Sequence, residues 1–259
     1  MISNGKISAG IDIGSRSVKV VLWDGLNVTS RTIIPTGWYP GDSAAKAYQA
    51  ALSQAGLERA EHILATGYGR FKADFADGQV TEITTHAKGI SLTLPQARAL
   101  IDIGGQDSKA MIIGEGGIVR DFAMNDRCAA GSGKFLEYLS SAMAMGVEEF
   151  AALGMESNNP ALISTVCTVF AETEVLSLLA EGVSKQDAAA GVHRAIAKRV
   201  AQMAASLHPP APIAFAGGVA LNQCMVRELS NALGCDIIVP EYPLFNGALG
   251  AAVIAFERI

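Results

Sequence analysis

The sequence contains an internal duplication, and this duplication constrains the fold more than any other feature. GIDIGSRSVKVVLWDG (10–25) aligns with LIDIGGQDSKAMIIGE (100–115) at a constant offset of 90 residues. Each copy reads as an apolar strand, a turn containing Asp-Ile-Gly and a second apolar strand. This pattern predicts a β-hairpin, not a strand–loop–helix unit, and two such hairpins predict two similar lobes. The aligned pairs are Asp12 with Asp102, Gly14 with Gly104, and Lys19 with Lys109.

Apolar runs and helical patterns alternate along the rest of the chain, which is typical of an α/β protein. Strands are predicted at 8–13, 18–23, 62–67, 98–103, 109–114, 212–217 and 235–240. Helices are predicted at 43–56, 184–208 and 246–256. The first of these helices has a natural N-cap in Asp42 or Ser43 and a natural C-terminal glycine in Gly56.

Composition narrows the functional class. The 259 residues are 50% hydrophobic and 17% charged, which predicts a chain that folds and does not stay disordered. The formal net charge is −5, and a basic stripe with interleaved aromatic residues is lacking, so nucleic acid is not an expected partner. Because we find neither a signal peptide nor an apolar run of membrane-spanning length, we expect a cytoplasmic protein that does not contact a membrane.

The two duplicated turns have the composition of phosphate-binding turns. Glycines at 14, 104 and 105 let backbone N–H groups approach a phosphate closely, and Ser15 and Ser17 add hydroxyl donors. Asp12 and Asp102 would be repelled by phosphate, but they suit Mg²⁺ held through its waters. One such turn alone is most simply a tight hairpin. Two matching turns, together with FAGGVALN (215–222), favour a nucleotide site in which Gly217 and Gly218 lie against an adenosine.

This combination resembles the acetate and sugar kinase, Hsp70 and actin superfamily. The resemblance implies two ribonuclease-H-like lobes with an ATP cleft between them: an N-terminal lobe at 1–90 and a C-terminal lobe at 91–259. The C-terminal helix at 246–259 is expected to pack back on the first lobe. By position, Asp12, Gly14, Ser15, Ser17 and Lys19 resemble the first phosphate loop, with Lys19 facing the phosphates. Asp102, Gly104, Gly105 and Gln106 resemble the second, with Gln106 orienting the attacking water.

Two cysteines lie in front of helical patterns. Cys128 stands in NDRCAAGSGKFLE (125–137) and Cys167 in ISTVCTVFAETEV (163–175). A thiolate at a helix N-terminus is favoured by the macrodipole, so both could hold an anionic cluster. Two thiols do not complete a four-thiolate site, but a symmetric dimer supplies two from each chain. Without the surrounding motifs, two ordinary buried cysteines remain an equal alternative, and this reading suits Cys224 and Cys235 better.

The ordered set of motifs resembles the activator component of 2-hydroxyacyl-CoA dehydratases, in the BadF/BadG/BcrA/BcrD ATPase family. Besides the segments above, this set includes ATGYGR (65–70), TEITTHAKG (81–89) and NGALGAA (246–252). The resemblance implies a homodimer with one [4Fe–4S] cluster shared by two chains, ATP and Mg²⁺ in each chain, and Cys128 and Cys167 as cluster ligands. One departure is Thr85, where many members have a cysteine that is not a ligand.

The resemblance implies an ATPase in which the nucleotide state controls electron delivery. A ferredoxin or flavodoxin is the expected donor, and a dehydratase or a related iron–sulfur reductase is the expected acceptor. Glu172, behind the second cysteine, could link its helix to the nucleotide site or could be a locally bonded carboxylate. A sugar-type small-molecule kinase is the main alternative function, and an ATP-gated binding module without a peptide-binding domain is a weaker one.

Overall fold

The computed structural model describes residues 5–126, 128–164 and 167–259. Arg127, Thr165 and Val166, which belong to the two cysteine-containing segments, lie outside the described residues. The chain forms two compact units. Among the described residues, the first unit consists of 5–97, 113–120 and 240–259, and the second consists of 98–112 and 121–239 with the gaps already named.

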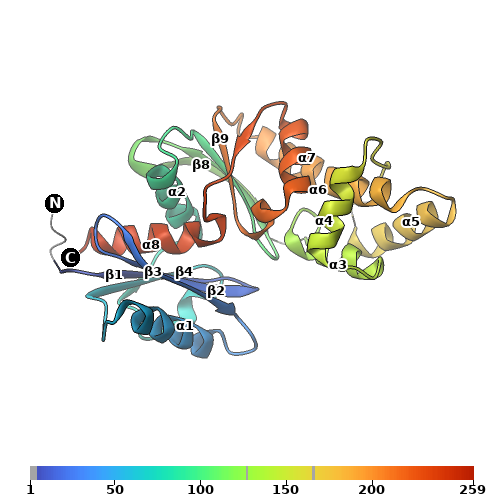
Figure 1. The fold of residues 1–259 in the computed structure, drawn as a ribbon. Coiled ribbons are helices and arrows are strands. Elements are labelled where there is room, and N and C mark those ends of the chain that lie inside the picture. The colour runs from blue at the N-terminus through green and yellow to red at the C-terminus, as the bar shows by residue number, and fades with distance from the viewer. Residues whose placement is uncertain (1–4, 127, 165–166) are drawn as a thin grey trace. The chain divides into compact units, whose positions relative to one another are not determined.

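The first unit is built on a five-stranded mixed sheet in the order β3-β2-β1-β4-β5. Its strands are β1 (Ser8–Ile13), β2 (Ser17–Trp23), β3 (Val28–Pro35), β4 (His62–Thr66) and β5 (Gly78–Gln79). The helix α1 (Pro40–Ala55) covers one face of the sheet, and α8 (Asn246–Phe256) covers the other (Figure 1). A third helix, α2 (Glu82–Thr93), packs on α8.

The second unit repeats this sheet. Its strand order is β10-β9-β6-β7-β8, which is the order of the first sheet written in the opposite direction. The strands are β6 (Ala99–Ile103), β7 (Ser108–Ile113), β8 (Val119–Asn125), β9 (Ile213–Ala216) and β10 (Ile237–Ile238). The two mixed sheets with their helices confirm the predicted α/β fold with a duplicated hairpin.

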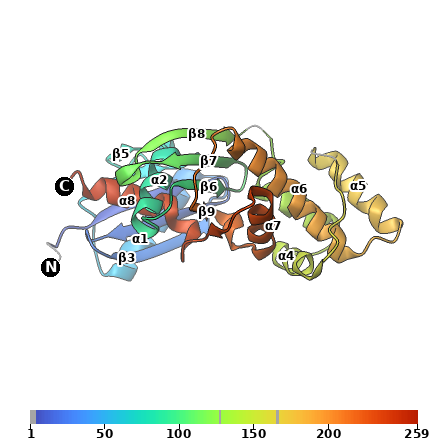
Figure 2. The same cartoon turned by 90° about the horizontal axis from the view of Figure 1, so that it is seen from above.

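The helices of the second unit pack around one large apolar core. They are α3 (Gly133–Ala142), α4 (Val147–Glu156), α5 (Thr168–Ala180), α6 (Lys185–Ala205) and α7 (Gln223–Leu233). Figure 2 shows α5 beyond α6, at the end of the unit away from the sheet. No helix within the described part of the chain has both the length and the apolar character needed to cross a membrane.

The two predicted hairpins are present, and they share one register. Asp12 pairs with Lys19 across β1 and β2, and Asp102 pairs with Lys109 across β6 and β7. In both sheets the next strand pairs parallel to the first strand of the hairpin: β4 with β1, and β9 with β6. The duplication therefore extends beyond the aligned sequence to a third strand of each sheet.

The predicted helix at 246–256 has the bounds of α8, but α6 ends at Ala205 and not at residue 208, and the start of α1 also differs. The predicted start at Asp42 or Ser43 is wrong: α1 begins at Pro40, after Tyr39. Proline suits the first turn of a helix because that position needs no N–H donor and because the fixed φ angle is already helical. At the other end, Gly56 has the predicted left-handed conformation, with φ of +67°.

The helices α2 and α8 approach each other so closely that their backbones are in contact. A Cβ atom added at Gly250 would lie 1.7 Å from the carbonyl oxygen of Thr85 and 2.9 Å from the amide nitrogen of Gly89. Because both atoms belong to helix backbone, a rotamer change would not relieve the clash. A glycine at position 250 is therefore required by this packing.

We expect Gly250→Ala to lower the free energy of unfolding by about 1–3 kcal/mol, the usual cost of overpacking. Gly146→Ala is the matched control: a Cβ there meets nothing within 4 Å, and the position is the N-cap of α4 with ordinary φ of −74°. Its expected cost is below about 1 kcal/mol. Urea unfolding of the two variants checks this. Equal stabilities would contradict the close helix contact.

Candidate functional site

The first duplicated turn holds Asp12 at the end of β1. The Asp12 carboxylate is buried, and its Oδ2 lies 3.5 Å from Lys19 Nζ. The amide of Gly14 donates to the carbonyl of Ser17 at 3.1 Å, which closes the turn. Ser15 and Ser17 are half-buried beside it. The structure thus brings all five predicted residues together at the turn end of one hairpin.

The second turn has the same backbone geometry and a stronger ion-pair network. Gly104 N donates to Asp107 O at 3.0 Å, the counterpart of the Gly14 bond. Lys109 is 2% exposed, and its Nζ lies 3.4 Å from Asp102 Oδ2 and 2.7 Å from Asp107 Oδ2. Gln106 is exposed at the tip of this turn, next to the half-buried Gly105.

In each sheet, the strand that pairs in parallel with the first strand of the hairpin is followed by a glycine, and this glycine packs against the aspartate of the hairpin. Gly217 follows β9 with φ of +87°, and a Cβ there would lie 2.8 Å from Asp102 Oδ1 and 2.4 Å from the carbonyl of Ile103. Gly67 follows β4 with φ of +86°, and its Cβ would lie 2.5 Å from Asp12 Oδ1. Only glycine leaves both carboxylates room at this φ. Gly218 is exposed and begins a short 3₁₀ turn, Gly218–Leu221.

Gly67 was not predicted as a site residue. The structure makes it the counterpart of Gly217, so ATGYGR in the first unit corresponds to FAGGVA in the second. The signal in the sequence is a glycine that directly follows a short, buried apolar strand, at 62–66 and again at 213–216.

The segment after Cys128 is hydrogen-bonded to the second turn. Gly133 N donates to Gly104 O at 2.9 Å, and Lys134 N donates to Gly105 O at 2.8 Å. The expectation that a helix follows Cys128 directly is wrong, because α3 begins only at Gly133. Residues 129–132 form a turn instead, and the first amides of α3 bind the carbonyls of the turn at 104–105.

The backbone around Cys128 is held by the end of β8. Asn125 Nδ2 donates to the carbonyls of Cys128, at 2.9 Å, and of Ala130, at 3.0 Å. The Cys128 side chain is half-buried against the core of the second unit. The Asn125 side chain therefore holds the main chain at Cys128 and just after it.

Cys167 is the N-cap residue of α5, as its sequence context predicts, and it is exposed. Ahead of it, the amide and the hydroxyl of Ser164 both donate to Glu174 Oε1, at 2.8 and 2.6 Å. Glu172, two residues before Glu174 in α5, accepts a hydrogen bond from the Tyr138 hydroxyl of α3. The hydrogen bond to Glu172 raises the pKa of Tyr138, and desolvation and the negative charge of Glu172 act in the same direction. The helices that follow the two cysteines are therefore joined.

The four thiols differ in their suitability as metal ligands. Cys224 is completely buried, and desolvation raises the pKa of its thiol to about 11, so it stays protonated at neutral pH. Metals bind the thiolate, so Cys224 is a poor ligand. Cys128 and Cys167 are both free thiols with access to solvent. Within the described residues there is no cluster of three or more His, Cys, Asp or Glu side chains placed to bind a metal. Of the four thiols, Cys224 is thus the least suited to bind a metal, and Cys128 and Cys167 remain candidate ligands.

Near the Gly217–Gly218 segment, a buried histidine supports the helices of the second unit. His193 Nδ1 donates to the carbonyl of Ala189 at 2.7 Å, and its Nε2 accepts from Asn222 Nδ2 at 3.0 Å. Burial lowers the pKa of His193 from 6.5 to about 4, because the charged imidazolium would lose its hydration. The ring is neutral at physiological pH, and it holds the residue that ends FAGGVALN.

This buried histidine predicts a loss of stability in acid. Between pH 6.5 and pH 4 the unfolded chain binds a proton at His193 that the folded chain does not bind, so stability is full above pH 6.5 and falls below it. We expect His193 to lower the free energy of unfolding by about 2 kcal/mol when the pH falls from 7 to 5. Urea unfolding at both pH values measures this change. The variant His193→Gln should lose this part of the pH dependence of stability, whereas His208→Gln, at an exposed position, should keep it. An unchanged pH dependence in His193→Gln would refute the assignment.

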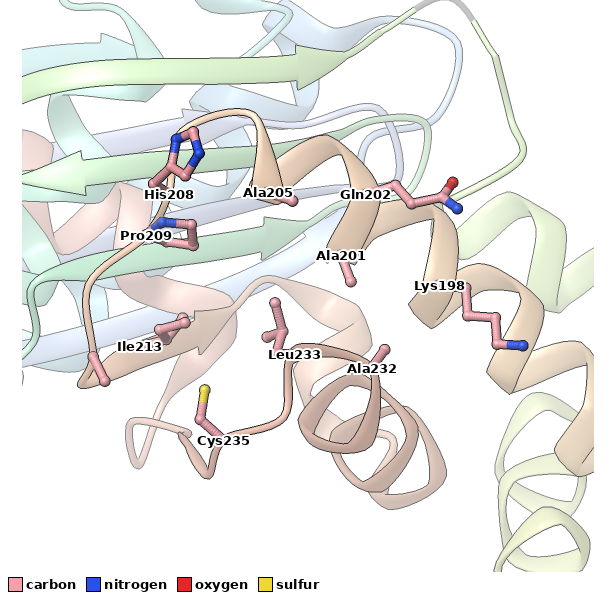
Figure 3. Close-up of a pocket in the computed structure, with 11 residues that line it drawn as sticks. Lys198, Ala201, Gln202, Ala205, His208, Pro209, Ile213, Ala232, Leu233 and Cys235 are labelled. Atoms are coloured by element: carbon pink, nitrogen blue, oxygen red, sulfur yellow. The ribbon is translucent and has the colours of Figure 1, made fainter.

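A surface pocket of about 920 Å³ lies elsewhere in the second unit (Figure 3). It is lined by α6, by the connection from α6 to β9 and by the end of α7, including Gln202, His208 and Cys235. It reaches β9 at Ile213, which is the end of the strand opposite to Gly217. The pocket is therefore separate from the predicted nucleotide residues.

Comparison with known proteins identifies close relatives. Residues 9–255 match the model of the BadF/BadG/BcrA/BcrD ATPase family. The activator of lactoyl-CoA dehydratase from Anaerotignum propionicum is 42% identical over 252 residues, covering 96% of each chain.

Two solved structures are each 36% identical in sequence to this chain. Component A of (R)-2-hydroxyglutaryl-CoA dehydratase from Acidaminococcus fermentans has a TM-score of 0.94 and covers 98% of this chain and 99% of its own. The activator of 2-hydroxyisocaproyl-CoA dehydratase from Clostridium difficile, with bound ADPNP, has a TM-score of 0.91 and covers 97% and 95%.

More distant structures share the fold alone. A ROK-family glucokinase from Streptomyces griseus has a TM-score of 0.63 at 14% identity. This likeness confirms that the two mixed sheets are of the type found in sugar kinases and related ATPases. The full-length match to the family model and the 42% identity decide the membership: the chain belongs to the BadF/BadG/BcrA/BcrD ATPase family.

Proposed function

We propose that this protein is an ATP-hydrolysing electron donor that activates a 2-hydroxyacyl-CoA dehydratase. The observation that carries the proposal is the pair of hydrogen bonds from Gly133 N and Lys134 N to the carbonyls of Gly104 and Gly105. These bonds join a candidate phosphate turn directly to the segment that contains Cys128. A change at the nucleotide is thereby transmitted to a candidate ligand of a redox centre.

In this proposal each of the two turns is a phosphate-binding loop for ATP with Mg²⁺. The amides of Gly14, Gly104 and Gly105 and the hydroxyls of Ser15 and Ser17 donate to phosphate oxygens. Asp12 and Asp102 accept hydrogen bonds from the waters of Mg²⁺, and Lys19 offsets phosphate charge. Gln106, exposed at the tip of the second turn, orients the water that attacks the γ-phosphate. Gly217 and Gly218 leave room for adenosine.

Cys128 and Cys167 hold the redox centre in this proposal. Both are free thiols that solvent reaches, and two chains together supply the four thiolates of one [4Fe–4S] cluster. When bound, such a cluster supplies a one-electron carrier whose potential depends on charge, hydrogen bonding and exposure. The arrangement requires a homodimer in which each chain contributes both cysteines.

The link between nucleotide and cysteines runs through α3 and α5. A movement of the Gly104–Gly105 turn displaces the first amides of α3, and Cys128 lies five residues before that helix begins. The bond from Tyr138 to Glu172 carries the movement to α5, which begins directly after Cys167. Glu172 thus has a role that the sequence left open.

The partners in this proposal are those that the family resemblance implies. A ferredoxin or flavodoxin in the cytoplasm supplies one electron, and a dehydratase or a related iron–sulfur reductase accepts it. Hydrolysis converts ATP and water to ADP and phosphate and makes the transfer directional. We favour a dehydratase as acceptor because the relatives named above are activators of dehydratases or components of them.

The test is to purify the protein without oxygen and to add it, with ATP and a strong reductant, to an inactive 2-hydroxyacyl-CoA dehydratase. We expect dehydratase activity that requires both ATP and the reductant, together with about one [4Fe–4S] cluster per two chains by iron and sulfide assay. ATP-dependent phosphorylation of a sugar, with one ADP formed per sugar phosphate and without iron in the protein, would overturn the proposal in favour of a small-molecule kinase.

A further inference from the structure

The last residue of β8 makes two contacts with the segment that contains Cys128, and the proposed function leaves these contacts without a role. Asn125 Nδ2 donates to the carbonyl of Cys128 at 2.9 Å and to the carbonyl of Ala130 at 3.0 Å. Carbonyl oxygens only accept hydrogen bonds, so both contacts require the amide nitrogen, and not the amide oxygen, to face this segment. One NH₂ group, which has two hydrogens, therefore holds two carbonyls.

A second side chain holds the carbonyl between these two. Ser132 Oγ donates to the carbonyl of Ala129 at 2.7 Å, and the Ser132 amide donates to the same oxygen at 3.0 Å. Three successive carbonyls, those of Cys128, Ala129 and Ala130, are thus hydrogen-bonded. Because a peptide group is planar, a fixed carbonyl also fixes the direction in which the main chain continues. The position of the Cys128 sulfur then depends chiefly on rotation about its Cα–Cβ bond.

A glycine lets the chain turn around the Asn125 amide. Gly131 has φ of +96°, which other residues rarely adopt, and a Cβ there would lie 3.6 Å from Asn125 Nδ2. Beyond this glycine, the amides of Gly133 and Lys134 bind the carbonyls of the second turn. The segment that contains Cys128 therefore has one anchor in β8 and a separate one in the candidate phosphate turn.

The corresponding position in the first unit has a different contact. Thr36 directly follows the third strand, β3, and its Oγ1 donates to the carbonyl of Gly14 at 2.7 Å, so it supports the first turn itself. In the second unit the carbonyl that corresponds to Gly14 O accepts from the Gly133 amide instead. A contact that the duplicated fold alone required would be expected in both units. The difference therefore associates Asn125 with Cys128 and not with the hairpin.

We propose that Asn125 is a positioning residue for Cys128: its NH₂ group holds the carbonyls of Cys128 and Ala130 and thereby sets where Cys128 presents its thiol to the redox centre. The proposal rests on the proposed function, in which Cys128 is a ligand of that centre. Asn125 acts through the main chain and is not a ligand itself. Ser132 supports the same segment through the carbonyl of Ala129.

The test measures how fast an iron chelator removes iron from the full-length protein, prepared without oxygen, in the wild type and in Asn125→Leu. Leucine has nearly the shape of asparagine but no N–H donor, so both carbonyls lose their partner. We expect iron to leave Asn125→Leu about 10-fold faster or more, because losing a group that orients a metal ligand usually costs about 10–100-fold in affinity. Asn231→Leu, at an exposed position in α7, is the matched control and should lose iron at the wild-type rate.

The EPR spectrum of the reduced protein separates positioning from a general loss of stability. If Asn125 positions Cys128, the ligand meets the iron in a different geometry in Asn125→Leu, and the g values or line widths of the signal change. A weaker signal with wild-type g values and line widths would mean that Asn125 only stabilises the fold, and it would overturn the inference. Asn125→Asp is a second variant of the same size, and its carboxylate has no hydrogen to donate. Iron loss from Asn125→Asp at the wild-type rate would overturn the inference even if the leucine variant does not fold.

The failure of the proposed function gives a different result. If the wild-type protein holds no iron even after reconstitution, or if Cys128→Ser retains its iron, Cys128 is not a ligand, and the proposed function fails together with the inference. If the wild type holds the cluster and Cys128→Ser loses it, while both Asn125 variants behave like the wild type, the ligand assignment stands and the inference about Asn125 alone is wrong.

Discussion

On the proposed function, we expect Cys128→Ser to remove the iron from the protein and to leave ATP binding intact. The expected wild-type content is about two iron atoms per chain, from one four-iron cluster shared by two chains. Serine offers a hard hydroxyl in place of a soft thiolate, and the replacement occurs in both chains of a dimer, so it removes two of four ligands. Iron and acid-labile sulfide are measured on protein prepared without oxygen, and ADPNP binding is measured by titration on the same samples.

The other cysteines supply the controls for this result. Cys167→Ser should lose iron to the same extent. Cys235→Ser should retain it, because Cys235 lines the separate surface pocket in the second unit. Full iron in Cys128→Ser, or an equal loss in Cys235→Ser, would contradict the ligand assignment. Loss of ADPNP binding together with the iron would show instead that the variant has not folded.

The hairpins at the centre of the fold were predictable because their determinants are local. Each needs two apolar strands and a turn residue that permits a tight reversal, and all of these lie within 16 residues of sequence. The duplication made the prediction stronger, since Asp12 and Lys19 occupy the same register as Asp102 and Lys109.

The correspondence of Gly67 with Gly217 was not predictable in the same way. Each glycine reaches its aspartate through a parallel strand pair, β4 with β1 and β9 with β6, whose members lie far apart in the chain. The strand sequences HILAT and IAFA share only their apolar character, which is too little for an alignment. Parallel pairing of this kind is set by tertiary packing, which a pattern within one segment does not report.

The wrong prediction of a helix directly after Cys128 has a related cause. The residues AGSGKFLEYLSSAM have good helical character, but Gly131 adopts φ of +96°, and the helix starts two residues later. The start is fixed by the carbonyls of Gly104 and Gly105, which lie nearly thirty residues earlier in the chain. Asp107 was missed for a simpler reason: it is an acidic residue in a turn, and only the structure brings it to Lys109.

The two lysines of the duplicated turns should differ strongly in their effect on stability. Lys109 is buried between two carboxylates, with Asp107 at 2.7 Å and Asp102 at 3.4 Å. Lys109→Met leaves the buried Asp102 and the partly exposed Asp107 without this cation, and breaking a buried ion pair in this way costs about 3–5 kcal/mol. Lys19 is more accessible and has a longer contact, 3.5 Å, with Asp12, so the matched variant Lys19→Met should cost less.

Urea unfolding of both variants measures the difference, and a second substitution tests its cause. If uncompensated negative charge destabilises Lys109→Met, removing one of the charges in Lys109→Met/Asp107→Asn should recover part of the loss, although Asp107→Asn alone should destabilise the wild type. Such coupling is expected for residues in direct contact. If the double variant is less stable than Lys109→Met, the loss of stability comes from the packing of the lysine side chain and not from its charge. If Lys19→Met and Lys109→Met are equally destabilised, burial and the second carboxylate add nothing to the contribution of Lys109 to stability.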